Sequence, residues 1–192
     1  MEDRTIEVRD HRLYLRAGDT YVYYTRFTAP DSFEEFREPL GRLGFDVANK
    51  IKIAEGNECL SGFKLKRPTL LEISRLTGER SGFLSVHTSG YEGSRRVLEE
   101  VAEELGLITD FPSEAFLDKV KKWGSYYAKQ NESTRAVYTY SKRSFEDSFG
   151  ALTYAAFLMD VQGLDSIKSI HMAGEAYGFN LEEALNSMCR QD

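Results

Sequence analysis

The residues best suited to bind an anion lie together between Thr88 and Arg96, in the stretch Thr-Ser-Gly-Tyr-Glu-Gly-Ser-Arg-Arg. Glycines let a ligand approach backbone N–H groups, and two arginines add positive charge with bidentate geometry. An apolar run precedes the stretch at 83–86, and an amphipathic pattern with Leu98 and Val101 on one face follows it. A strand that leads into a helix N-terminus suits a phosphate or carboxylate. We therefore predict an anion site formed by Thr88, Ser89, Gly90, Gly93, Ser94, Arg95 and Arg96.

The charges of this helix support the prediction but also allow another interpretation. Arginines near its start and glutamates toward its end oppose the helix dipole, at a cost of roughly 0.3 to 1 kcal/mol each, and a bound anion would explain them. Alternatively, the arginines pair along the helix, Arg95 with Glu99 and Arg96 with Glu100. If Ser89 is the N-cap, both arginines also move into the second turn. The stretch matches neither the P-loop nor the dinucleotide-binding motif.

Catalytic and metal-binding candidates are few. His87 ends the predicted strand and could act as a general acid or base. No partner acid or nucleophile is set by spacing, so a histidine that is only hydrogen-bonded is the alternative. His171 and Glu175 share a helix face, but two ligands without a third do not make a metal site. We predict no metal and no cofactor, and we assign no role to Cys59 or Cys189.

Aromatic residues in two predicted strands suggest a second kind of ligand. Tyr21, Tyr23 and Phe27 share one strand face, and Phe63 lies in another strand. Together they could stack the bases of single-stranded RNA, although the Gly-Phe pair that includes Phe63 lacks the next aromatic of the RNA-recognition pattern. Packing between strands is the alternative. Residues 60–96 hold seven basic and three acidic residues, but the net charge is −6, so a nucleic-acid partner is disfavoured without being excluded.

The composition is that of a globular protein. Of 192 residues, 41% are hydrophobic and 12% aromatic. No apolar run approaches the roughly 18 residues of a transmembrane helix, and the charged start of the chain does not resemble a secretory signal. The two cysteines lie far apart in sequence and suggest no disulfide framework. We therefore predict a cytoplasmic protein with no membrane partner.

The predicted fold is α+β. From Thr20 the patterns give a β-α-β-β-α-β order, which matches a ferredoxin-like sheet, with an added N-terminal hairpin over 4–17. Asp31 is the predicted N-cap of the first helix, and Pro68 begins the second. The predicted elements are strand 20–28, helix 31–43, strands 45–54 and 59–66, helix 69–76, strand 82–87 and helix 94–106.

The chain after residue 110 is predicted to be mostly helical. Helices are expected over 113–129, from Ser144 to Gly163, over 164–177 and from Asn180, with Ser144 and Asn180 as N-caps. One isolated strand is expected over 134–140. The domains are therefore 1–110 and 111–192. Whether the two pack as one unit is left open, and the helical region could serve in a homodimer.

Three functions are compatible with these patterns. The first is a binding or regulatory protein that takes an anionic small molecule or partner at residues 88–96. The second is an enzyme acting on a phosphorylated or carboxylate substrate, with His87 as the acid or base and Arg95 and Arg96 holding the anion. The third is a single-stranded RNA-binding module. The sequence does not decide whether the protein is an enzyme.

Overall fold

The computed structural model describes residues 4–9, 12–17, 20–28, 30–54, 56–89, 91–107, 109–110 and 114–190. The strands are β1 (Arg4–Arg9), β2 (Arg12–Ala17), β3 (Thr20–Thr28), β4 (Asp46–Val47), β5 (Lys52–Ala54), β6 (Asn57–Lys64), β7 (Thr69–Leu76), β8 (Ser81–Thr88) and β9 (Thr109–Asp110). The helices are the 3-10 helix η1 (Phe33–Phe36), α1 (Arg37–Arg42), α2 (Tyr91–Glu104), α3 (Glu114–Ser141), α4 (Phe145–Asp160), α5 (Ser166–Tyr177) and α6 (Leu181–Met188).

The strands form an antiparallel sheet in the order β1-β2-β3-β8-β7-β6-β4, with β5 paired to β6 and β9 paired to β3. β6, β7 and β8 run as a meander, and β8 lies beside β3. At one end of the meander Thr69 pairs with both Lys64 and Thr88. This register brings the turn between β6 and β7 next to the loop that follows β8.

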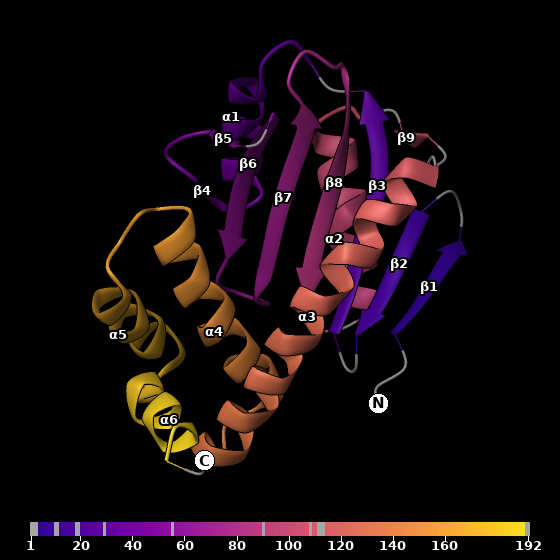
Figure 1. Cartoon of the computed structure of the whole chain (residues 1–192). Helices are drawn as coiled ribbons and strands as arrows, with labels where there is room; N and C mark the ends of the chain where they lie inside the picture. The colour runs from indigo at the N-terminus through magenta and orange to yellow at the C-terminus, as the bar shows by residue number, and fades with distance from the viewer. Residues whose placement is uncertain are drawn as a thin grey trace.

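Helices cover both faces of the sheet (Figure 1). α2 lies behind the sheet in this view, α3 crosses in front of it, and α4 lies at the lower ends of β6 and β7. Side chains alternate between the faces of a strand, so β7 sends Leu71 and Ile73 into the core under α1 and α2. On the other face Phe63 packs against Phe157 and Leu158 of α4. α5 and α6 complete a helical cluster with α3 and α4.

The α+β class and the N-terminal hairpin are confirmed, since β1 and β2 pair antiparallel. The ferredoxin-like order is not confirmed, because the predicted helix over 69–76 is strand β7. Both faces of β7 are covered, so apolar residues appear at Leu70, Leu71 and Ile73 without a clean alternation. A proline followed by apolar residues at this spacing is also typical of the first turn of an amphipathic helix, which is why the sequence predicted a helix after Pro68.

The C-terminal region is mostly helical, as predicted, but the strand predicted over 134–140 is wrong. These residues form the end of α3. Their β-branched and aromatic side chains favour strands, yet Asn131, Thr134 and Val137 are all buried and recur every three residues on one helix face. Tertiary burial therefore overrides the local preference. The predicted boundary near 110 lies between β9 and α3, and 111–113 lie outside the described residues.

Two of the predicted helix caps are confirmed and one is wrong. Ser144 and Asn180 each accept a hydrogen bond from the backbone N–H three residues on, both at 3.0 Å. Asp31 does not cap its helix, since Ser32 Oγ accepts from the backbone of Glu34 instead. Among the described residues, no helix combines the length and the apolar character needed to cross a bilayer.

Candidate anion site

Helix α2 begins at Tyr91, three residues before the start predicted from the pattern. Arg95 and Arg96 therefore lie in its second turn. Arg95 is exposed and forms an ion pair with Glu99, with 3.1 Å between Arg95 Nε and Glu99 Oε1. This is the pairing along the helix that the charge pattern allowed. Gly90 lies outside the described residues.

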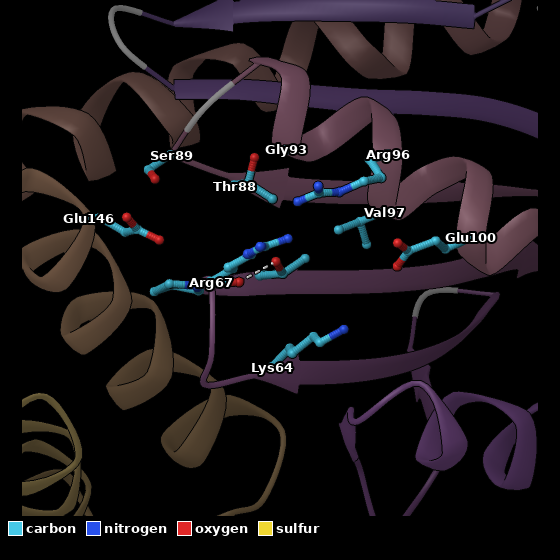
Figure 2. Close-up of a pocket in the computed structure, with 11 residues that line it drawn as sticks. Lys64, Arg67, Thr88, Ser89, Gly93, Arg96, Val97, Glu100 and Glu146 are labelled. Carbon is cyan, nitrogen blue, oxygen red and sulfur yellow. Dashed lines mark hydrogen bonds between the residues drawn. The ribbon is translucent and has the colours of Figure 1, made fainter.

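A cavity of about 330 Å³ lies where β6, β7 and β8 meet the start of α2. Of the predicted anion-site residues, Thr88, Ser89, Gly93 and Arg96 line it, whereas Ser94 and Arg95 do not. In Figure 2 the side chains of Arg67 and Arg96 extend into the middle of this pocket, with Glu146 and Glu100 on its two sides. The lining residues are Lys64, Arg67, Pro68, Thr69, Thr88, Ser89, Gly93, Arg96, Val97, Glu100 and Glu146.

Three cationic side chains from three different segments share this pocket. Lys64 comes from the end of β6, Arg67 from the β6–β7 turn and Arg96 from α2. The Lys64 ammonium lies 5.5 Å from the ring centroid of Phe45. Within the described part of the chain, neither the Arg67 nor the Arg96 guanidinium forms an ion pair or a hydrogen bond. Their donors are therefore available to a ligand.

The turn that carries Arg67 is held in place from several sides. Arg67 has a positive φ of 54°, a conformation that is uncommon for a non-glycine residue. The Thr69 hydroxyl donates to the Arg67 carbonyl oxygen at 2.7 Å. The Tyr177 hydroxyl of α5 donates to the carbonyl oxygen of Leu65 at 3.0 Å. The C-terminal helices therefore help to position one wall of the pocket.

α4 approaches the same turn closely at Gly150. A Cβ at this position would lie 2.5 Å from Pro68 Cγ and 2.5 Å from Tyr177 Cζ, which is closer than atoms can pack. Only glycine therefore allows α4 to lie against the turn. The contact also brings Glu146, one helical turn earlier, to the edge of the pocket.

Hydroxyl groups at the end of β8 link this strand to α2. Thr88 and Ser94 form a hydrogen bond through their side-chain oxygens, and Ser94 Oγ also lies 3.4 Å from the carbonyl oxygen of Tyr21. Ser94 is fully buried, so its hydroxyl fastens the helix to the sheet. Thr88 also reaches the cavity, where it adds a neutral polar group.

His87 faces away from this pocket. It follows the alternation of β8 onto the face covered by α3 and α4, and its ring centroid lies 4.5 Å from that of Tyr127 and 4.8 Å from that of Phe149. Neither ring nitrogen has a hydrogen-bond partner among the described residues. Burial lowers the pKa of His87 to about 3, so the ring is neutral at physiological pH. His87 does not contact a ligand in the pocket.

The aromatic residues considered for RNA stacking do not share an exposed face. Tyr23 and Phe27 are buried in the core under α1 and α2. Phe63 points to the other face, where its ring stacks on that of Tyr154 at 5.0 Å. Tyr21 is only partly buried, with the Arg16 guanidinium 5.8 Å from its ring centroid. These rings serve packing between sheet and helices and form no platform.

The predicted absence of a metal site remains a prediction. His171 Nε2 and Glu175 Oε1 are 3.3 Å apart on the exposed face of α5. Within the described residues no group of three or more histidine, cysteine, aspartate or glutamate side chains is placed to bind a metal ion.

Sequence reasoning missed part of the pocket, including Lys64, Arg67, Thr69, Glu100 and Glu146. Lys64 and Arg67 belong to the basic segment 60–96. Lys64 and Arg67 lie beside Arg96 because Thr69 pairs with Thr88. The sequence predicted a helix over 69–76, and a helix there would not form this strand pairing. No protein family, no curated protein and no solved structure matches this chain, so its function is argued from the pocket itself.

Proposed function

We propose that this chain is a binding or regulatory protein that takes an anionic small molecule in the pocket between α2 and the β6–β7 turn. The ligand would carry a phosphate or a carboxylate. The observation that supports this most strongly is the pair Arg67 and Arg96. These guanidinium groups come from separate elements, line one cavity and have no carboxylate partner in the described structure.

Electrostatics explains why such a pair favours an anion. Like charges that share a cavity repel each other, and a bound anion replaces this repulsion with two attractions. A guanidinium group also presents parallel N–H donors that match two oxygens of a phosphate or carboxylate. Ser89 lines the same cavity, and its hydroxyl can donate to the anion. The Thr69 hydroxyl already donates to the Arg67 carbonyl oxygen, so it can only accept a hydrogen bond from the ligand.

The two glutamates narrow the class of ligand. Glu100 and Glu146 line opposite sides of the pocket, and a carboxylate accepts hydrogen bonds but donates none. They therefore suit hydroxyl or amino groups on the body of the ligand, while its anionic end lies between the arginines. A cavity of about 330 Å³ is at the small end of ligand pockets, which fits a compact metabolite.

Binding is favoured over catalysis by the position of His87. This residue was the candidate acid or base, and it lies on the opposite face of the sheet in an apolar environment. Among the residues that line the pocket, the titratable acids and bases are Glu100, Glu146 and the cations themselves. The cations of this set can orient an anion, and the residue proposed as acid or base is not among them.

Calorimetric titration and thermal-shift assays with inorganic phosphate, pyrophosphate and succinate test the proposal. At least one of these probes should raise the melting temperature at low ionic strength, with the effect reduced by added salt. Arg67→Gln and Arg96→Gln should each weaken binding about tenfold or more, as expected for a lost charge-assisted hydrogen bond.

Arg95→Gln is the matched control. It removes the same charge from the adjacent position of the same helix, but Arg95 is paired with Glu99 and does not line the pocket. Its affinity should remain close to that of the unmodified chain. Equal losses from Arg95→Gln and Arg96→Gln, or no loss from Arg67→Gln and Arg96→Gln, would show that the anion binds elsewhere.

A further inference from the structure

A row of polar side chains crosses the sheet face that lies under α3 and α4. Tyr24 of β3 pairs with Ser85 of β8, Ser85 pairs with Glu72 of β7, and Glu72 pairs with Ser61 of β6. We call these four residues the polar row. Tyr24, Ser85 and Ser61 are 0%, 2% and 5% exposed. A sheet face covered by helices is normally apolar, because buried polar groups lose their hydration.

Two further polar groups share this face beside the polar row. Ser74 follows Glu72 on the same face of β7 and pairs with Cys59 of β6. Ser74 is 6% exposed, and its hydroxyl has no hydrogen-bond partner in the described structure. Cys59 Sγ lies 3.7 Å from Ser61 Oγ. A hydroxyl buried without a partner weakens a fold, so its presence here indicates a purpose other than stability.

Glu72 is the charged member of the polar row. Its side chain keeps some access to solvent, and it forms no hydrogen bond or ion pair within the described chain. The surrounding protein desolvates the carboxyl and raises its pKa, Lys52 of β5 lowers that pKa, and Asp160 of α4 raises it. The carboxyl therefore lacks the partner that a desolvated charge requires.

Aromatic rings and a second carboxylate flank Glu72. α3 and α4 meet at one end and diverge across this face of the sheet (Figure 1). From α3, Tyr127 is buried and Tyr126 is 54% exposed. Burial, and after it the negative charge of Glu72, raises the pKa of both tyrosine hydroxyls. With Asp160 opposing Lys52, the charges around the polar row sum to a negative value. Tyrosine ring faces add further negative potential.

We propose that the polar row binds a primary ammonium group, with the Glu72 carboxylate as its counter-ion. An ammonium group has three N–H donors. The Glu72 carboxylate would accept from it, and the hydroxyl of one neighbouring serine in the row, Ser61 or Ser85, would accept a second hydrogen bond. This site lies on the opposite face of the sheet from α2, and it does not depend on the proposed anion pocket.

The experiment is an NMR titration of the full chain with n-butylammonium at low ionic strength, with 1-butanol as the neutral comparison. The amine should cause saturable shifts at the backbone amides of the polar row, and the alcohol should not. Because n-butylammonium stays charged throughout, its affinity should fall on acidification as Glu72 takes up a proton. Among the described side chains, the other titratable groups near this carboxyl are Lys52, Asp160, Tyr24, Tyr126, Tyr127 and Cys59.

Glu72→Gln keeps the shape of the side chain and should weaken amine binding about tenfold or more. Glu79→Gln is the matched control, since Glu79 is exposed in the turn after β7 and carries the same charge. Unchanged affinity in Glu72→Gln, equal binding of the alcohol, or no saturable shift at the polar row would each overturn the proposal. The comparison of amine with alcohol and the pH series both use the unmodified chain. They therefore test ammonium binding at the polar row even if Glu72→Gln does not fold.

Discussion

The Tyr177 hydroxyl in α5 donates a hydrogen bond to the carbonyl oxygen of Leu65 in the β6–β7 turn, at 3.0 Å. These residues are 112 positions apart in the chain, and their contact joins the C-terminal helices to the turn that carries Arg67. One wall of the proposed anion pocket is therefore positioned by helices that contribute little to its lining. Changes in α4 and α5 should consequently alter ligand binding.

Tyr177→Phe removes this hydrogen bond and keeps the ring. We expect a loss of about 1 kcal/mol in the free energy of unfolding and a several-fold weaker affinity for the anion, because the turn loses one of its anchors. Urea unfolding and calorimetry measure the two effects. Tyr140→Phe is the control, since it loses a 3.0 Å hydrogen bond to Glu183 among the same helices without touching the pocket. Equal affinities in the two variants would contradict the coupling.

Gly150→Ala should destabilise the protein by about 1 to 3 kcal/mol, as expected for overpacking. The new methyl group would meet Pro68 and Tyr177, both at 2.5 Å, and neither ring can rotate away freely. Gly41→Ala is the control, because a Cβ there has nothing within 4 Å. That substitution should be neutral or should stabilise α1 by up to about 1 kcal/mol. Urea unfolding compares the two, and similar values would refute the close contact.

His87 should make the protein less stable in acid. Its pKa falls from 6.5 to about 3 on folding because burial disfavours the charged ring. Between these two pKa values the unfolded chain binds a proton at this histidine and the folded chain does not. The free energy of unfolding therefore falls as pH drops from about 6.5 to about 3. The loss amounts to several kcal/mol, at about 1.4 kcal/mol per pKa unit.

His87→Leu should remove this dependence, which urea unfolding across the pH range would measure. His171→Gln changes an exposed histidine of α5 and should keep the original acid dependence. If His87→Leu retains the full slope, another group is responsible.

Glu72 should make the protein less stable as pH rises, which is opposite to the effect of His87. Desolvation raises its pKa above the ordinary value of 4.5, so its stabilising contribution is complete below 4.5 and is lost as pH rises through the folded-state pKa. Glu72→Gln should therefore stabilise the protein more at pH above about 7 than at pH about 4. Thermal unfolding at both pH values provides the measurement, and an equal effect at both would argue against a desolvated carboxyl.

Arg75 should be important for stability because it ties β7 to the segment after β3. Its guanidinium pairs with Glu58 at 2.6 Å and donates to the carbonyl oxygens of Pro30 and Asp31, both at 2.7 Å. Arg75→Lys cannot make these three contacts at once and should cost about 2 to 4 kcal/mol. Arg80→Lys, in the exposed turn that follows, should change stability by less than about 0.5 kcal/mol. Chemical unfolding of both variants tests the difference.

Local chemistry was enough to predict part of this structure. Ser144 and Asn180 were identified as helix caps because a cap depends on a side chain and a backbone N–H only three residues away. The amphipathic helix over 94–106 and the N-terminal hairpin follow from short-range periodicity in the same way. The loop at 88–96 was predicted as an anion site, and four of its residues line the pocket.

Long-range contacts decided the rest. Strand β7 contains Glu72 and Ser74 on a covered face, so its alternation is hidden until β6 and β8 pair with its two edges. Residues 134–140 favour a strand locally and become helical because Thr134 and Val137 are buried by other helices. The sequence alone therefore determined where charge lies along the chain and where two of the helix caps lie. Only the tertiary structure brought Arg67 to Arg96 and turned His87 away from them, because strand pairing and side-chain alternation act between segments distant in sequence.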